Sequence, residues 1–315
     1  MQQTREPIAP HATKGGAAAM AMLALLSAAL PTLTAQSPLS FVDSDNVTVG
    51  DNPVDIATGD FNRDGKPDLV VLNQTSESVS VLLGDGIGNF SAGPNLSVIS
   101  GPRAVLVGDL DRNGIDDVTV VNSTSQDIVV RLGLASGSFG AATSFAAGIS
   151  GNSGVMADFN EDGRLDVIVI GLNGGVRFLQ GNGNGSFAAP VVVNVANARR
   201  HVATADFNRD GHLDLVFPAG ASQVTIALGV GDGTFGAGTA FSTVDQPLEL
   251  APVDLNRDGR MDLAIATTEI NKMALLLGDG NGGFGAPSTP FTTQTNHVKV
   301  ADFDRDGIPD CCSSI

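Results

Sequence analysis

The 315-residue chain contains no tryptophan, no tyrosine and only two cysteines. The two cysteines, Cys311 and Cys312, are adjacent, and vicinal cysteines are poorly placed to form an ordinary disulfide. Cysteine and histidine show no zinc-type spacing. The sequence therefore excludes a disulfide framework and a cysteine-ligated zinc site as the basis of the fold.

Basic residues are also scarce, because 17 Lys and Arg stand against 34 Asp and Glu, for a formal net charge of −17. We expect no nucleic-acid partner, since such binding needs Lys and Arg to neutralise phosphates. An acidic surplus can serve solubility alone or can bind cations, and the positions of the acids decide between the two. The one basic cluster, "NARRH" at residues 197–201, we interpret as a surface loop rather than an anion site.

A long apolar run occurs only near the N-terminus. Arg5 and Lys14 precede residues 16–30, "GAAAMAMLALLSAAL", which have the length of a signal-peptide core and are short for a membrane span. We predict a signal peptide over residues 1–35, with an uncleaved anchor as the alternative. The mature chain would then be exported with no membrane span, as a secreted, extracellular or periplasmic protein, and a cell-surface location stays open.

The rest of the sequence is a repeat of about 48 residues. An acidic loop of the form D-[FL]-[ND]-x-[DN]-G-x-x-D begins at Asp60, Asp109, Asp158, Asp206, Asp254 and Asp302. A Gly-rich turn follows each of the first five loops and ends at Phe90, Phe139, Phe187, Phe235 and Phe284. Phe41 keeps the same register, so the repeat begins there.

Between these markers the sequence predicts only strands. In the first repeat, runs rich in Val, Ile and Leu cover residues 54–59, 69–73, 78–84 and 96–100, bounded by Gly, Asn, Ser and Pro. Four short strands in roughly 40–50 residues are typical of a β-propeller blade. We predict an all-β propeller over residues 36–315, with five complete blades and an incomplete last one. A β-solenoid is the alternative, although its repeats are usually shorter.

The acidic loop has the donor pattern of a calcium site. In the first copy, positions 1, 3, 5 and 9 are Asp60, Asn62, Asp64 and Asp68, and Gly65 allows the sharp turn. Hard oxygen ligands on a flexible loop suit Ca²⁺ better than Mg²⁺. An EF-hand is excluded, because position 12 is never Glu and strands flank the loop. An Asp-rich turn that caps its own backbone without metal is the alternative.

Six copies with every ligand position filled favour metal binding, and nineteen of the 34 acidic residues occupy these positions. We predict up to six Ca²⁺ ions, one for each loop. The predicted ligands are Asp60, Asn62, Asp64, Asp68, Asp109, Asp111, Asn113, Asp117, Asp158, Asn160, Asp162, Asp166, Asp206, Asn208, Asp210, Asp214, Asp254, Asn256, Asp258, Asp262, Asp302, Asp304, Asp306 and Asp310.

The segments "GDFNRDGKPDLVV", "LLGDGIGNFSAGP" and "GDGNGGFGAP" resemble FG-GAP repeats. Such repeats form the propeller of integrin α-subunits and occur in many secreted bacterial proteins of the VCBS type. The resemblance covers about residues 41–310 and implies a calcium-stabilised β-propeller. In the integrin-like members, ligands bind on the face opposite the calcium loops. The resemblance does not imply integrin function, because one fold hosts many activities.

A mostly polar position occurs five residues before each loop, among apolar neighbours. We expect these residues near the propeller axis, on the face opposite the calcium loops, and predict that they form a recognition ring. Ordinary solvated strand starts are the alternative. The ring consists of Asp55, Ala104, Ser153, His201, Glu249 and His297.

Catalytic motifs are missing: the sequence has no G-x-S-x-G, no His-rich metal set and no triad order. We therefore predict a monomeric, non-catalytic binding or adhesion module for a protein or glycan, with no catalytic residues. The alternative is a calcium-dependent, lyase-like propeller enzyme that acts on polysaccharide. A convergent cluster of Lys, Arg, Tyr and His in an axial pocket would favour that enzyme.

The C-terminal segment departs from the repeat. An apolar strand follows each earlier loop, but "CCSSI", residues 311–315, follows Asp310. We expect this strand to be missing, the last blade to be incomplete, and the sixth calcium site to be the least secure. We expect the strand after Phe41 to be the outer strand of that blade. If one base is restored in a coding sequence for residues 310–315, the segment reads Asp-Leu-Leu-Leu-Val-Asp, which is the expected strand. Our hypothesis is therefore a one-base deletion in the gene or in its sequencing. The intact protein would then have six or seven blades.

Overall fold

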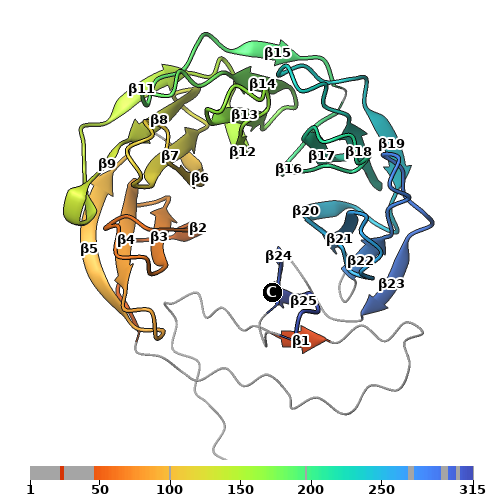
Figure 1. Ribbon diagram of the computed structural model, residues 1–315, viewed down its shortest axis with the longest axis horizontal. Helices are drawn as coiled ribbons and strands as arrows, with labels where there is room; N and C mark the ends of the chain where they lie inside the picture. Colours follow the sequence, from red (N-terminus) through yellow and green to blue (C-terminus); the bar gives the residue numbers. More distant parts are fainter. Residues whose placement is uncertain are drawn as a thin grey trace, which may run out of the picture.

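The computed structural model describes residues 22–24, 46–98, 101–195, 197–268, 273–291, 297–302 and 306–314. In these residues, antiparallel sheets stand around a central axis, with their first strands innermost (Figure 1). Five sheets have four strands each, and a sixth has three. Each four-stranded sheet is one repeat and is called a blade, numbered one to five along the chain. The predicted all-β propeller is confirmed.

Blade one shows how the repeat becomes a sheet. Its strands β2 (Pro53–Gly59), β3 (Asp68–Asn73), β4 (Ser78–Gly84) and β5 (Phe90–Ser97) pair in chain order. The middle strands β3 and β4 are almost fully buried. They read as continuous apolar runs because both of their faces are covered. The outer strand begins at Phe90, before the predicted 96–100, because its mostly exposed residues lack an apolar signal.

The other four blades repeat this order. Blade two contains β6 (Pro102–Gly108), β7 (Asp117–Asn122), β8 (Asp127–Arg131) and β11 (Thr143–Ala146). Its turn holds β9 (Gly133–Leu134), η1 (Ala135–Gly137) and β10 (Ser138–Phe139). Blade three contains β12 (Gly151–Ala157), β13 (Asp166–Gly171), β14 (Val176–Leu179) and β15 (Val191–Val193). Blade four contains β16 (Ala203–Ala205), β17 (Asp214–Ala219), β18 (Gln223–Ala227) and β19 (Thr239–Ser242). Blade five contains β20 (Pro247–Val253), β21 (Asp262–Thr267), β22 (Met273–Leu276) and β23 (Ser288–Phe291).

The hydrophobic core lies between neighbouring sheets. Phe61 and Leu72 of blade one pack in one cluster with Val120 of blade two. Phe159 of blade three likewise shares a cluster with Phe217 of blade four. Burying a side chain of this size contributes about 1.5–3 kcal/mol, so each seam between sheets is a substantial source of stability.

The sixth sheet contains β24 (His297–Ala301), β25 (Asp310–Ser314) and β1 (Met22–Ala24), with β25 in the middle. The expectation that residues 311–315 lack a strand is therefore wrong. Backbone pairing does not require apolar side chains, and Cys311 serves as a small hydrophobic residue, 7 % exposed, in the cluster with blade five. Residues 22–24 fall within the predicted signal peptide, which stays a prediction. Phe41 lies outside the described residues.

One face of blade one, the face that carries the side chain of Ile56, is more exposed to solvent than the corresponding face of most other sheets. Ile56 on β2 is 52 % exposed, whereas the residue at the same place is buried in four of the other sheets, and blade three has the half-buried Gly154 there. These equivalents are Val105, Val202, Leu250 and Val298.

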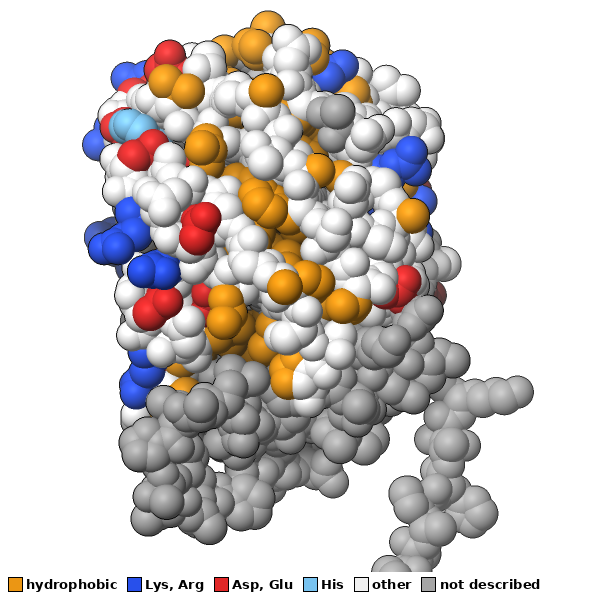
Figure 2. All heavy atoms as spheres, turned by 90° about the vertical axis from the view of Figure 1, so that its right-hand side faces the viewer, with side chains coloured by type: hydrophobic (Ala, Val, Ile, Leu, Met, Phe, Trp, Pro, Cys, Tyr) orange, Lys and Arg blue, Asp and Glu red, His pale blue; other side chains and the backbone are white. Residues whose placement is uncertain are grey.

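The wall of the ring differs from its two faces in charge. Seen from the side, hydrophobic side chains run down the middle, and Lys and Arg gather toward the two edges (Figure 2). These edges correspond to the two faces of the ring, where the loops lie.

The part of the chain that the structure describes has no helix long and apolar enough to cross a membrane.

Candidate functional site

Each acidic loop folds around its own first carboxylate. In the first loop, the N–H of Asp64 donates to Oδ1 of Asp60 at 3.0 Å, and the N–H of Gly65 donates to Oδ2 at 2.9 Å. Oδ1 of Asn62 accepts from Asp64, and Oδ1 of Asp64 accepts from Lys66. Loops two to five repeat all four bonds. Positions 1, 3 and 5 therefore all turn oxygens into the loop, as predicted.

The sixth loop keeps part of this pattern. Asp306 and Gly307 both donate to the carboxylate of Asp302, and Ile308 donates to Asp306. Its position 3, Asp304, lies outside the described residues.

Glycine at position 6 is required by the backbone. Its φ is 77° at Gly65 and 78° at Gly163, in the left-handed region that residues with a Cβ rarely adopt. A Cβ added at either glycine would meet nothing within 4 Å. Backbone conformation alone, without crowding, therefore selects glycine here.

The aspartate at position 9 is buried, and its carboxylate accepts hydrogen bonds from both the acidic loop and the Gly-rich turn. Oδ2 of Asp68 accepts from the N–H of Phe61 at 2.9 Å, and Oδ1 accepts from the N–H of Gly84 at 2.8 Å. Gly84 begins the Gly-rich turn, so the acidic loop and this turn lie side by side on one face, as predicted. The same two bonds, 2.6–3.1 Å long, are made by Asp117, Asp166, Asp214 and Asp262. The spacing of the acidic residues predicts position 9 only as a ligand, and its structural role depends on the fold.

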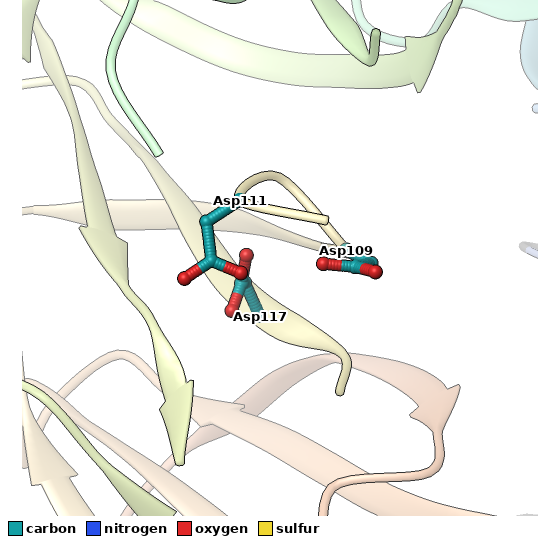
Figure 3. A group of neighbouring side chains, drawn as sticks. All are labelled: Asp109, Asp111 and Asp117. Atoms are coloured by element: carbon teal, nitrogen blue, oxygen red, sulfur yellow. The ribbon is translucent and has the colours of Figure 1, made fainter. Parts of the chain in front are cut away.

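The second loop brings three carboxylates into ligand distance of one another. One oxygen from each of Asp109, Asp111 and Asp117 lies within 4.8 Å of the others. In Figure 3, Asp111 and Asp117 lie close together and Asp109 lies across the loop. Two ligands of one Ca²⁺ ion can be at most about 5 Å apart, since each lies about 2.3–2.6 Å from the ion. The donor set therefore fits calcium.

The charges in the loops also favour a cation. Burial raises the pKa of Asp117 to about 6, and the charges of Asp111 and Asp109 act in the same direction. These effects outweigh the hydrogen bonds from Gly133 and Leu110, which lower it. Burial likewise raises the pKa of Asp166 to about 6. A bound divalent cation would stabilise the ionised carboxylates and so lower these pKa values again.

In blades two to five, the phenylalanine that ends the Gly-rich turn packs with position 2 of the acidic loop of the preceding blade. Ring centroids are 5.8 Å apart for Phe159 and Phe235 and 5.6 Å apart for Phe207 and Phe284. The N–H of Gly233 also donates to the carbonyl of Phe159 at 3.1 Å. Position 2 of the loop therefore joins one blade to the next, which explains why the two sequence markers recur in register.

The other ends of the inner strands line an axial cavity of about 970 Å³. All six residues of the predicted ring contribute to its wall, so their predicted convergence is confirmed. They are Asp55, Ala104, Ser153, His201, Glu249 and His297. Asp55 and Glu249 also accept hydrogen bonds from Val105 and Val298 in the next sheet. Two ring positions therefore have a structural role as well.

Four basic side chains, which the ring prediction did not include, line the same cavity: Arg103, Arg199, Arg200 and Lys299. In the segment 197–201, interpreted from the sequence as a surface loop, Arg199 and Arg200 are exposed, and together with His201 they line this cavity. The position of this segment in the repeat could have predicted its place at the cavity, because the segment ends at the ring residue His201.

Glu249 is the centre of a charged cluster in this cavity. Oε1 lies 2.7 Å from Nζ of Lys299, and Oε2 lies 3.0 Å from Nδ1 of His297. Burial acts to raise the pKa of Glu249, but these partners lower it to about 2. Burial lowers the pKa of His201 to about 4, and no described group hydrogen-bonds its Nδ1. At neutral pH, Glu249 is thus ionised and His201 is neutral.

The model of the FG-GAP-like repeat matches residues 60–120, 109–169, 158–217, 216–265 and 254–313. No curated protein matches the chain.

Similar solved structures include an Agrocybe aegerita lectin, described in terms of specific recognition of non-reducing terminal N-acetylglucosamine. It is 21 % identical, with a TM-score of 0.55, and the match covers 75 % of this chain and 65 % of the lectin. A Lactobacillus plantarum protein is 14 % identical, with a TM-score of 0.56, and the match covers 77 % of this chain and 72 % of that protein. At these identities the likeness shows the shared fold alone.

Proposed function

Because the chain belongs to the FG-GAP-like repeat family, we propose that it is an exported, calcium-stabilised propeller that binds a protein or glycan without catalysis. Its ligand would enter the axial cavity on the face opposite the acidic loops. The observation that carries this proposal is the convergence on one cavity of the same repeat position from six sheets. The size of the cavity, about 970 Å³, is in the range of pockets that hold small ligands.

Calcium would have a structural role in this proposal. The carboxylates of each loop would hold one ion, with Asp109, Asp111 and Asp117 as the best-defined set. The ion would supply the positive charge that these crowded and buried acids require. The cavity lies on the other face, so calcium would stabilise the scaffold without contacting the ligand.

A glycan is the favoured ligand class. The Agrocybe aegerita lectin with the same fold is described as recognising terminal N-acetylglucosamine, which shows that such a propeller can bind sugars. Asn152, Ser153 and Thr204 line the cavity of this chain, and their side-chain oxygens could accept hydrogen bonds from hydroxyls, while Nδ2 of Asn152 and Oγ1 of Thr204 donate to backbone carbonyls.

The direct test is a glycan array probed in calcium and in excess chelator. A cavity variant, Leu172→Trp, should abolish any signal, because Leu172 lines the cavity, is 42 % exposed and would be replaced by a larger ring. Binding that survives Leu172→Trp unchanged would contradict an axial site.

An enzyme acting on polysaccharide is the second candidate, and one observation favours it. Lys, Arg and His converge on the axial cavity, as the sequence analysis required of such an enzyme, although the chain has no Tyr. Incubation with acidic polysaccharides, followed by ultraviolet absorbance of an unsaturated product, would distinguish an elimination reaction from binding alone.

A further inference from the structure

We infer that the axial cavity takes a saccharide that carries a carboxylate, such as a uronate unit of an acidic glycan. In this inference, the guanidinium groups of Arg199 and Arg200 bind the carboxylate. The inference rests on the proposed binding function of the same cavity and adds the chemical class of the ligand.

The charge of the cavity is opposite to that of the chain. Its lining contains four Lys or Arg side chains and two carboxylates, Asp55 and Glu249, whereas the chain as a whole has twice as many acids as bases. The acidic loops lie at the other end of the inner strands. An anion approaching this protein therefore meets its concentrated positive charge at the axial cavity.

The arginines are the cations left to bind a ligand. Lys299 and His297 are already engaged with the carboxylate of Glu249, at 2.7 and 3.0 Å. Among the described residues, no ion pair joins the guanidinium group of Arg199 or Arg200 to a carboxylate. An arginine can bind a carboxylate through two parallel hydrogen bonds, which gives both strength and orientation.

The backbone that carries these arginines is held in place before any ligand arrives. Arg200 has a φ of 63°, in the left-handed region that a residue with a Cβ seldom occupies. Its carbonyl accepts a hydrogen bond from Nδ2 of Asn152 at 2.5 Å, and the N–H of Arg199 donates to the carbonyl of Pro218 at 3.0 Å. Unfavourable backbone held by surrounding bonds is common at ligand sites, where it pre-organises the contact.

The rest of the lining suits a sugar acid better than a neutral sugar. Among the described residues no Phe lines the cavity, and the chain has no Trp or Tyr, so sugar rings lack the usual stacking surface there. Affinity must then come mainly from charge, with the side-chain oxygens of Asn152, Ser153 and Thr204 as acceptors for hydroxyl groups, since Nδ2 of Asn152 and Oγ1 of Thr204 already donate to backbone carbonyls. An acidic peptide could bind the same arginines, but it has no sugar hydroxyl groups to donate to these polar side chains.

The test compares three probes by calorimetry in calcium: trigalacturonate, its trimethyl ester and triglutamate. The ester keeps the hydroxyls and removes the charge, and the peptide keeps the charge and removes the sugar. We expect trigalacturonate to bind and the other two to bind at least tenfold more weakly. The double variant R199Q/R200Q should weaken trigalacturonate binding at least tenfold. The matched control, Arg177→Gln on β14 and outside the cavity lining, should not change it.

Thermal melting identifies folded variants, and no loss of stability is expected for R199Q/R200Q, because neither guanidinium group forms an ion pair with a described residue. Should R199Q/R200Q not fold, the ester comparison on the unchanged protein still decides. Equal binding of acid and ester, equal binding of triglutamate, or no binding of trigalacturonate would each overturn the inference. The proposed function fails separately, if no array ligand depends on the cavity by the Leu172→Trp test.

Discussion

The ammonium group of Lys299 lies 2.7 Å from Oε1 of Glu249, so a charged hydrogen bond joins β24 to β20 across the boundary of two sheets. The backbone N–H of Val298 donates to the same carboxylate at 3.2 Å. Asp55 accepts from Val105 in the same way, between blades one and two. The polar position before each loop thus lines the cavity and, where it is acidic, also joins neighbouring sheets.

Glu249→Gln should destabilise the fold by about 1–3 kcal/mol, because hydrogen bonds to a charged group contribute about this much. The loss includes the bonds to Lys299 and His297, and both of these side chains keep access to water. Chemical denaturation at neutral pH measures the effect. Lys299→Gln, which leaves Glu249 and the other partners in place, should cost less, and an equal or larger loss for this variant would contradict the central role of Glu249.

The same residue predicts a pH dependence of definite sign. The pKa of Glu249 is about 2 in the folded chain and 4.5 ordinarily, so the unfolded chain takes up a proton first as pH falls. Its stabilisation is fully present above pH 4.5 and is lost as pH falls toward 2. The difference in unfolding free energy between the natural chain and Glu249→Gln should shrink over this range.

His297 adds an effect at higher pH. Its hydrogen bond with Glu249 raises the pKa of His297 above the ordinary 6.5. Its contribution is therefore complete below pH 6.5 and is lost as pH rises through the raised value. A difference between the two chains that stays constant from pH 7 down to pH 2 would contradict the Glu249 effect, and one that stays constant as pH rises above 6.5 would contradict the His297 effect.

Excess chelator should lower the melting temperature markedly, and added Ca²⁺ should restore it. An ion present at 100 times its dissociation constant stabilises the folded state by about 2.7 kcal/mol for each site. Mg²⁺ at the same concentration should restore less, because it demands stricter geometry. An unchanged melting curve in excess chelator would rule out structural calcium.

Asp166→Asn should destabilise the chain by about 1–3 kcal/mol even in chelator, because an amide can accept from only one of the two N–H groups that this carboxylate satisfies. The measurement is best made above pH 7, where the carboxylate is ionised. Asn160→Asp places in loop three the residue type that loop two has at the same position, and it should change little. Equal losses for the two variants would mean that position 9 has no special structural role.

Gly163→Ala should cost about 1–2 kcal/mol through backbone strain, since φ is 78° and no atom would crowd the new Cβ. Gly163→Asn should cost less, because asparagine tolerates the left-handed region. The order of the two melting temperatures tests this account, and a lower melting temperature for the asparagine variant would contradict it.

Much of this fold could be predicted from the sequence, because the repeat is its main physical constraint. The spacing of Asp60 and Asp109 set the size of a blade, and the apolar run at 69–73 marked a strand covered on both faces. Register also predicted that Asp55 and Glu249 would meet in one cavity.

The features that the sequence did not predict depend on contacts between residues far apart in the chain, which the spacing of motifs along the sequence does not reveal. Asp68 resembles a ligand in sequence, but only the fold shows that its two oxygens accept from Phe61 and Gly84. Arg199 and Arg200 resemble a solvated cluster until the inner strands converge. The strand at Cys311 was missed because its side chains lack the apolar pattern, although its backbone can still pair.

The exposure of Ile56 has a consequence for how the molecule opens. Blade three is held by packed clusters on both sides, through Phe159 and Val169, whereas the face of blade one that carries Ile56 is partly open to water. Local opening free energies follow the apolar contacts that must be broken. Amide protons of β2 should therefore exchange with solvent deuterium sooner than those of β12, and protection should increase from blade one toward the middle of the chain.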